Sequence, residues 1–345
     1  MTPKERLWAA VRGEPLDRVP VAPRIWRYAK SVNRSLIELA QQYDFEVSLC
    51  AGSLLTAVHD YFGTRGDQWP EARVEVRAER DGQMTRIERT IRTPGGVLHD
   101  ALVLPDAGGD YGISPNPEWS EPLVKTRADA ELLPYLLPAP DQMKTCFDEL
   151  LRLEEEVGDM GFLAVRPSIG PDHLAVDSLG VVQALMASAA EPDFLARVVE
   201  IADDWHTEVM KVVLEGGFRL IFDSLYNFSL SVGWSPNFYR RVAMPMIKRH
   251  ADLVHSYGGT LFFYDDGKMA KSVGCMVEAG ADIIETLTPA PAGDIIYADL
   301  AREHGGKACF KGGIDTAYEL GQIAGADRAS TRHIDTLRDL VSKLT

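Results

Sequence analysis

The chain has 345 residues, of which 46% are hydrophobic and 25% are charged. This composition is typical of a soluble globular protein with a large core and argues against a disordered chain. The formal net charge of −15 argues against a nucleic-acid-binding protein, because contact with phosphates needs a basic face. The length suits one α/β barrel with insertions, so we expect a single domain over residues 1–345.

The four cysteines, Cys50, Cys146, Cys275 and Cys309, are widely spaced and form no CxxC pair. The sequence therefore predicts neither a disulfide framework nor a cysteine-rich zinc knuckle. No apolar run reaches the roughly 20 residues that a bilayer-spanning helix needs, and no apolar signal segment opens the chain. We expect a cytoplasmic protein without membrane contact.

In chain order, the first predicted element is a helix over residues 2–12, which Thr2 and Glu5 open as a capping box. Residues 19–24 then predict the first strand of a barrel. Four side chains at or beyond the end of that strand are candidates to line a pocket: Arg24, Trp26, Arg27 and Tyr28.

Residues 71–104 interrupt the alternation of predicted strands and helices. Apolar and polar residues alternate with period two around turns at 81–82 and 94–96. This alternation predicts an antiparallel meander inserted into a βα connection. Two roles remain open, a lid or oligomer contact on one hand and a solvated excursion on the other.

The second half of the chain alternates strictly between strand and helix patterns. The predicted strands lie at 161–167, 219–224, 260–264, 280–285 and 307–313, and the predicted helices at 141–157, 181–189, 192–215, 236–257 and 269–279. Such alternation predicts an α/β fold with a parallel sheet and helices outside it.

Two neighbouring stretches organise the candidate site, 260–268 and 280–294. Each is an apolar run that ends in acidic residues and a glycine, as a buried parallel strand does where it delivers polar groups to a loop. In an α/β barrel the active site lies at the carboxyl ends of the strands. The catalytic candidates are Asp223, Tyr264, Asp265, Asp266 and Glu285, and the substrate-binding candidates are Arg24, Trp26, Arg27, Arg166, His173, Tyr226 and Lys311.

Each candidate has a structural alternative. Asp223 is either a site carboxylate or a capping residue, and Glu285 either a site carboxylate or a salt-bridge partner in the barrel mouth. Asp265 and Asp266 are adjacent and face opposite ways on a strand, so at most one points into the barrel. Converging carboxylates act as a general acid or bind a divalent cation. His173 is either within reach of the mouth or solvated in a loop.

Several motifs resemble the uroporphyrinogen decarboxylase superfamily. They are the opening Met1-Thr-Pro-Lys-Glu-Arg with Arg12-Gly-Glu and Asp17-Arg-Val-Pro, then Leu220-Ile-Phe-Asp-Ser, Ser235-Pro with Pro245, Asp266-Gly, Gly280-Ala-Asp, Pro289-Ala-Pro-Ala-Gly-Asp and Gly312-Gly-Ile-Asp. The resemblance implies a TIM (β/α)8-type barrel. Members usually continue past the helix near 333–344, so we expect an incomplete last β/α unit.

The resemblance is closer to the methyltransferase-like branch than to true uroporphyrinogen decarboxylases. The latter carry Arg-Gln-Ala-Gly-Arg-Tyr after the first strand, whereas this chain has Arg24-Ile-Trp-Arg-Tyr-Ala-Lys there. Many of the methyltransferases hold zinc with a His-x-Cys pair, and Tyr264 and Asp266 occupy those places. We therefore expect no thiolate zinc site, no metal and no tightly bound cofactor.

The resemblance thus implies transfer of a methyl group from a small methoxylated or methylated compound to a corrinoid protein. In that mechanism Asp266 or Glu285 protonates the leaving heteroatom, Asp223 orients the substrate, and the arginines hold an anionic end. A decarboxylase of a tetrapyrrole or small acid and a non-catalytic ligand-binding barrel are the alternatives. A homodimer is expected from the family.

Overall fold

The computed structural model divides into two compact units. The first consists of Met1–Gly52, Thr145–Arg166 and Val213–Thr345, and the second of Ser53–Lys144 and Pro167–Val212. The structure describes all residues except 26–28, 30–31, 55–70, 83, 106–117 and 314–345. The predicted helix near 333–344 lies outside the described residues. That the whole chain is a single domain stays a prediction.

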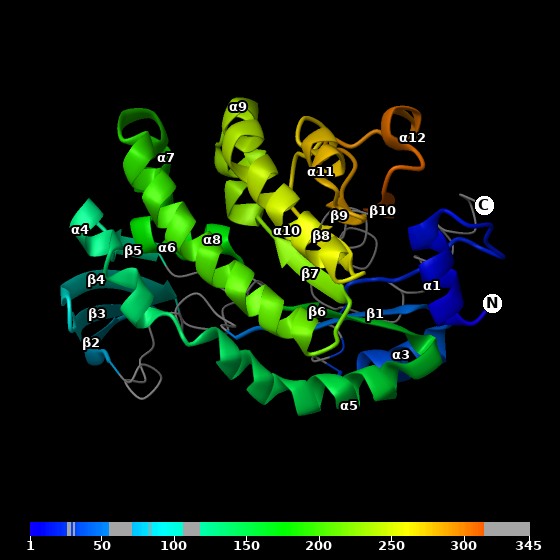
Figure 1. Cartoon of the computed structure of the whole chain (residues 1–345), viewed down its shortest axis with the longest axis horizontal. Coiled ribbons are helices and arrows are strands. Elements are labelled where there is room, and N and C mark those ends of the chain that lie inside the picture. Colours follow the sequence, from blue (N-terminus) through cyan, green and yellow to red (C-terminus); the bar gives the residue numbers. More distant parts are fainter. Residues whose placement is uncertain (26–28, 30–31, 55–70, 83, 106–117, 314–345) are drawn as a thin grey trace. The chain divides into compact units, whose positions relative to one another are not determined.

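A parallel sheet forms the centre of the first unit (Figure 1). All its pairings are parallel, and its order is β1 (Val47–Gly52), β6 (Gly161–Arg166), β7 (Leu220–Ser224), β8 (Thr260–Tyr264), β9 (Ile283–Leu287) and β10 (Cys309–Gly312). The α/β class and the five strands predicted in the second half of the chain are confirmed.

The helices of the first unit are α1 (Pro3–Arg12), α3 (Leu36–Tyr43), α5 (Phe147–Val157), α9 (Pro236–Phe238), α10 (Met244–Ser256), α11 (Val273–Ala279) and α12 (Tyr297–His304), with short turns η4 (Gly158–Met160), η5 (Tyr226–Phe228), η6 (Leu230–Val232) and the π-helix η7 (Tyr239–Ala243). They include the helices predicted at 2–12, 141–157, 236–257 and 269–279, and also α3 and α12, which the sequence did not predict. The predicted capping box of α1 is present, and Gly13 ends that helix in the left-handed conformation.

The prediction of a first strand over residues 19–24 is wrong. The described residues there adopt no strand conformation, and one backbone bond, from Glu46 N to the carbonyl of Val21, ties the segment to the chain just before β1. Pro20 and Pro23 lack the N–H groups that a strand ladder needs. The first strand of the sheet along the chain is β1, which the sequence did not predict.

The two faces of the parallel sheet bury different side chains, because neighbours along a strand point to opposite faces. We call the inner face the one that carries Phe162, Phe222 and Phe262, whose rings pack edge to face with centroids 6.2 and 5.4 Å apart. The outer face carries Ile221 and Phe263, which are fully buried. Helix α10 contacts β8 on that outer side.

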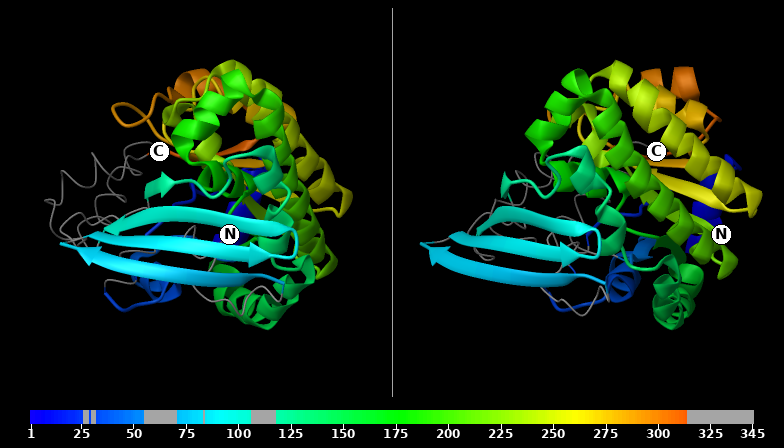
Figure 2. Two further views of the ribbon diagram at one scale, coloured as in Figure 1. Left: turned by 90° about the vertical axis from the view of Figure 1, so that its left-hand side faces the viewer. Right: turned by 60° about the vertical axis from the view of Figure 1, so that its left-hand side comes forward.

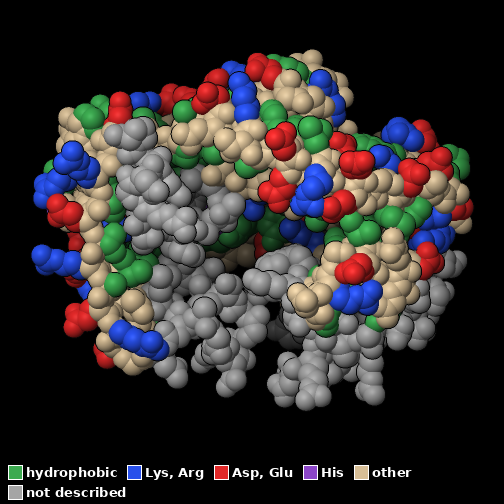
Figure 3. Space-filling view, turned by 90° about the horizontal axis from the view of Figure 1, so that it is seen from below, with side chains coloured by type: hydrophobic (Ala, Val, Ile, Leu, Met, Phe, Trp, Pro, Cys, Tyr) green, Lys and Arg blue, Asp and Glu red, His purple; other side chains and the backbone are tan. Residues whose placement is uncertain are grey.

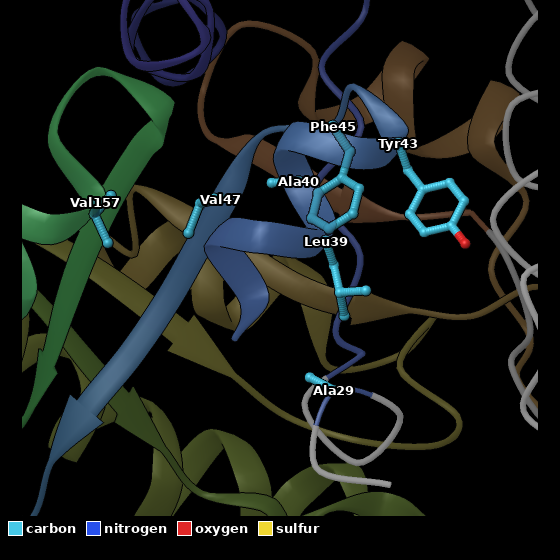
Figure 4. Close-up of a cluster of buried hydrophobic side chains, with 7 residues drawn as sticks. All are labelled: Ala29, Leu39, Ala40, Tyr43, Phe45, Val47 and Val157. Carbon is cyan, nitrogen blue, oxygen red and sulfur yellow. The ribbon is translucent and has the colours of Figure 1, made fainter. Parts of the chain in front are cut away.

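A second apolar cluster joins α3 to the start of β1 (Figure 4). Leu39 and Ala40 of α3 pack with Phe45 and Val47, and Val157 at the end of α5 completes this contact. Ser35 and Glu38 form a capping box that fixes the start of α3. The cluster therefore sets the position of β1, a strand that the sequence did not predict.

The second unit contains an antiparallel sheet of β2 (Arg73–Asp81), β3 (Met84–Thr93), β4 (Gly96–Pro105) and β5 (Glu118–Glu121), in that order (Figure 2). The predicted meander is confirmed, and β5 is an addition to it. Between β3 and β4, Arg89 forms a buried ion pair with Asp100, with 2.9 Å from Nε to Oδ1.

The helices of the second unit are short apart from α8. They are α4 (Arg127–Ala130), η2 (Leu133–Leu136), α6 (Pro171–Leu179) and α7 (Val181–Ala190). Helix α8 (Pro192–Glu215) and the 3-10 turn η3 (Pro140–Cys146) lead from this unit into the first. The predicted helix 141–157 therefore begins as a 3-10 turn.

Within the described residues no single helix is long and apolar enough to cross a membrane. The pair α6 and α7 meets the length and composition criterion only together, and the two helices are bent by 93° at their junction.

Candidate active site

The inner face of the first unit carries a buried carboxylate at the end of β9. Glu285 is 2% exposed, and it accepts hydrogen bonds from the Arg24 guanidinium and from Lys311 Nζ, the latter at 2.9 Å. Lys311 also donates to Ser48 Oγ at 3.2 Å. Glu285 therefore forms the salt bridges of the second interpretation, with Arg24 and Lys311, and its role as a site carboxylate stays a prediction.

Aromatic rings hold the arginines of this site. The Arg24 guanidinium carbon lies 5.4 Å from the ring centroid of Phe222 and 5.0 Å from that of Tyr264. Arg166, at the end of β6, lies 5.8 Å from the Phe222 centroid and donates to Ser224 Oγ at 3.2 Å. Contacts between guanidinium groups and aromatic faces are attractive, so three cations from distant parts of the sequence gather at one end of the sheet.

Tyr264 connects this group to the loop after β8. Its hydroxyl donates to Asp266 Oδ2 at 3.0 Å, and the Tyr226 ring packs edge-on against it with centroids 6.0 Å apart. Burial, and then the negative charge of Asp266, raise the pKa of Tyr264 above its ordinary value, against the opposing effect of Arg24. Its hydroxyl therefore keeps its proton.

Cys50 on β1 lies in the same group, although no pattern in the sequence predicts it as a site residue. Burial raises the pKa of its thiol to about 11; the charges of Arg166, Arg24 and Lys311 lower it, and that of Glu285 raises it. We define the inner layer as the polar side chains at this end of the inner face: Arg24, Ser48, Cys50, Arg166, Ser224, Tyr264, Glu285 and Lys311.

The structure places two predicted catalytic carboxylates on the outer face. Asp223 is buried and lies 2.7 Å, from Oδ2 to Nδ1, from His250 of α10. Asp265 is fully buried and accepts a hydrogen bond of 3.1 Å from the Tyr239 hydroxyl. The alternation of strand side chains explains both positions, and it leaves Asp266 as the acidic neighbour of the inner layer.

Backbone geometry at the end of β9 is unusual. Thr286, directly after Glu285, has a φ of 70°, which a β-branched residue rarely adopts. The pairing of β9 with β10 shifts register at the same point, between Phe310 and Gly312. Such departures from regular backbone are frequent beside functional groups.

His173 is not in a solvated loop. It lies in α6 of the second unit, is 2% exposed, and its Nδ1 is 3.2 Å from Asp177 Oδ2. Burial raises the pKa of Asp177, and His173 acts in the opposite direction. Trp26, Arg27 and Tyr28 lie outside the described residues.

The place where the resemblance expects zinc ligands holds Tyr264 and Asp266. A protonated phenol bonded to a carboxylate offers neither the thiolate nor the imidazole that zinc prefers there. These two residues do not fit a thiolate zinc site.

On the face of the molecule in Figure 3, described side chains of both charges lie interspersed.

Comparisons with known proteins agree with this architecture. A solved structure of a methyltransferase from Methanosarcina mazei is similar with a TM-score of 0.61 and 14% sequence identity, over 100% of this chain and 99% of that chain. At this identity the likeness concerns the fold. No curated protein matches the sequence significantly. The uroporphyrinogen decarboxylase (URO-D) family matches residues 96–339, well over half of the chain. The chain therefore belongs to the uroporphyrinogen decarboxylase family.

Proposed function

We propose that the protein is a methyltransferase that takes a methyl group from a small methoxylated or methylated compound with an anionic group and passes it to a corrinoid on a partner protein. Family membership and the fold shared with the Methanosarcina mazei methyltransferase support the proposal. The observation that carries it is the inner layer, in which Arg24 and Lys311 bind Glu285 and a third cation, Arg166, contacts the Phe222 ring that also contacts Arg24.

The charge balance of the inner layer favours an anionic substrate. Among the ionisable side chains of the inner layer, Arg24, Arg166 and Lys311 are cations, and Glu285 is the carboxylate that accepts from Arg24 and Lys311. Positive charge therefore exceeds negative charge among these groups. Guanidinium groups bind carboxylates through paired hydrogen bonds, so an incoming carboxylate fits between Arg166 and its neighbours.

The aromatic side chains offer a place for the rest of the substrate. Phe222, Tyr226 and Tyr264 pack against each other at the strand ends, and two of them also contact the arginines. Rings of this kind bury apolar and aromatic groups well. A methoxylated acid with its carboxylate on the cations then places its ether oxygen near Tyr264.

Tyr264 and Asp266 stabilise and neutralise the negative charge that develops on the leaving heteroatom. The carbon–oxygen bond of the methyl ether breaks, the oxygen keeps the electron pair, and the Tyr264 hydroxyl turns from Asp266 to this oxygen and donates its one hydrogen bond there. Asp266 is exposed and bonded to Tyr264, so it relays a proton from solvent. A reduced corrinoid on the partner protein would supply the electron pair that forms the new bond to the methyl group. Glu285 is left as the counter-ion of Arg24 and Lys311.

The test is methyl transfer from a panel of methoxylated acids to free reduced cobalamin, followed by its visible spectrum. We expect turnover that falls in Asp266→Asn and substrate affinity that falls in Lys311→Met. Metal content is measured on the same samples by mass spectrometry. Stoichiometric zinc that is lost in Asp266→Asn would contradict the expectation that no zinc site is present.

Decarboxylation is the second candidate, because the excess positive charge of the inner layer also suits a substrate with carboxylates. Release of labelled carbon dioxide from uroporphyrinogen or a small acid, without methyl transfer, would select it. A ligand that protects Cys50 from alkylation but is not converted, with Asp266→Asn binding it equally well, would instead identify a non-catalytic barrel.

A further inference from the structure

Strand β2 is a long exposed edge of the antiparallel sheet in the second unit (Figure 2). It pairs with β3 on one side, and no strand among the described residues pairs with its other side. Eight of its nine residues are exposed, and Val74 is partly buried. Edge strands of this length invite pairing with another chain unless something prevents it.

The hairpin geometry fixes which backbone groups face the open edge. Asp81 pairs with Met84 across a two-residue turn, and the residues that flank such a turn exchange both of their hydrogen bonds. Hydrogen-bonded and non-hydrogen-bonded pairs alternate along an antiparallel ladder. The N–H and C=O groups of Val74, Val76 and Ala78 therefore point away from β3, toward the open edge.

The side chains of β2 are self-complementary in one antiparallel register. We propose that a second copy of this chain pairs with β2 around a two-fold axis at Val76, so that one sheet continues through both copies. In this register Arg73 lies opposite the partner's Glu79, and Glu75 lies opposite the partner's Arg77. On the other face Val74 meets the partner's Ala78, and Val76 meets its own copy. A two-fold interface repeats each contact.

Neighbouring registers are unfavourable. If the axis is centred on Arg77, this arginine lies opposite its own copy and Glu75 lies opposite the partner's Glu79. If the axis is centred on Glu75, Arg73 lies opposite the partner's Arg77. Like charges directly opposite each other destabilise a sheet. Charged side chains along an edge usually oppose pairing, but the alternating signs of β2 make opposite charges face each other in the register centred on Val76.

The intrachain pairing supports the same arrangement. Arg77 lies opposite Glu88 of β3 and Glu79 opposite Arg86, so β2 already takes part in a ladder of opposite charges that the second copy would extend. On the other face the side chain of Val76 is 38% exposed, and pairing would cover it. The family match begins at residue 96, so β2 and β3 are outside the region that the family defines.

The first test is Arg73→Glu. Arg73 lies opposite Arg92 of β3, so this reversal removes a like-charge pair within the chain and leaves the fold supported. Across the interface the introduced glutamate at position 73 lies opposite the partner's Glu79, and the two-fold axis repeats this like-charge pair. We expect the dimer dissociation constant, measured by analytical ultracentrifugation, to rise about tenfold. The double variant Arg73→Glu/Glu79→Arg restores dimerisation, and Lys144→Glu, an exposed site with the same charge change, leaves it unchanged.

The second test is a cross-link at the axis. Hydrogen-bonded antiparallel pairs have Cα atoms about 5.5 Å apart, within the range of a disulfide. Val76→Cys should therefore form a covalent dimer under mild oxidation, while Val97→Cys, exposed on β4, and the unmodified chain should not. A wild-type monomer at concentrations up to roughly 100 μM would overturn the proposal. So would a dimer that Arg73→Glu leaves intact and that Val76→Cys does not cross-link.

Discussion

The inner and outer faces of the parallel sheet use buried carboxylates in different ways. Glu285 on the inner face is shared by Arg24 and Lys311, which lie with other polar groups at the strand ends. Asp223 on the outer face is equally buried, but its partner is His250 of a packed helix. Burial of a carboxylate therefore does not identify an active site. The groups around the carboxylate are the better criterion, because Glu285 lies with two cations at the strand ends whereas Asp223 lies against a histidine of α10.

The largest expected effect is on the outer face. Asp223→Ala removes the hydrogen bond between the buried Asp223 and His250, and losing one partner of a buried hydrogen bond costs about 1–3 kcal/mol. We expect the free energy of unfolding, measured by urea denaturation, to fall by about this amount. Asp223→Asn keeps a hydrogen-bonding group next to His250 and should cost clearly less. A stable Asp223→Ala protein that has lost only activity would contradict the assignment to a structural role.

The inner face should respond in the opposite manner. Arg166→Gln removes one cation of the inner layer, and we expect the affinity for an anionic substrate to fall roughly tenfold, the value of a charged hydrogen bond. Unfolding should change little, since the Arg166 side chain is only partly buried. Lys248→Gln on the exposed side of α10 is the matched control and should change neither quantity. Equal affinity in Arg166→Gln and wild type would remove Arg166 from the site.

This contrast also explains what the sequence could predict. Strands β6 to β10 were identified because each is an apolar run that ends in a polar residue, and alternation correctly separated Asp265 from Asp266. Strand β1 was missed, since Val-Ser-Leu-Cys-Ala-Gly has no clear apolar period. Ser48 and Cys50 were therefore missed with it. The partners of Asp223 and Asp265 come from helices that meet the strands only in the folded chain, so no local pattern reveals them.

A smaller effect compares two tyrosines that each donate to a carboxylate. Tyr239→Phe on the outer face removes the hydrogen bond to Asp265, and we expect a loss of about 1 kcal/mol in the free energy of unfolding with unchanged substrate binding. Tyr264→Phe on the inner face removes the bond to the exposed Asp266 and should instead slow turnover. Both variants are measured by urea denaturation and by the methyl-transfer assay. Slower turnover with unchanged stability in Tyr239→Phe, together with lower stability and normal turnover in Tyr264→Phe, would contradict these two assignments.

The smallest effect concerns Cys50, which reports on the charge of the inner layer without turnover. Burial raises the pKa of its thiol from 9.0 to about 11, so near pH 8 the thiolate fraction, and with it alkylation by iodoacetamide, should be roughly 100-fold lower than for an ordinary thiol. Because the folded state raises this pKa, the thiol's contribution to stability is complete below about pH 9 and is lost as the pH rises through about 11.

Variants of the inner layer should move the labelling rate in predictable directions. Glu285→Gln removes a charge that raises the pKa of Cys50, so labelling should become faster, whereas Arg166→Gln removes a charge that lowers it, so labelling should become slower. An anionic compound bound among these cations should slow labelling further by adding negative charge and by covering the thiol. Peptide mass spectrometry resolves Cys50 from Cys146, which lies at the start of α5 and serves as the internal control. Labelling of Cys50 that ignores both variants and the compound would show that the thiol does not face the inner layer.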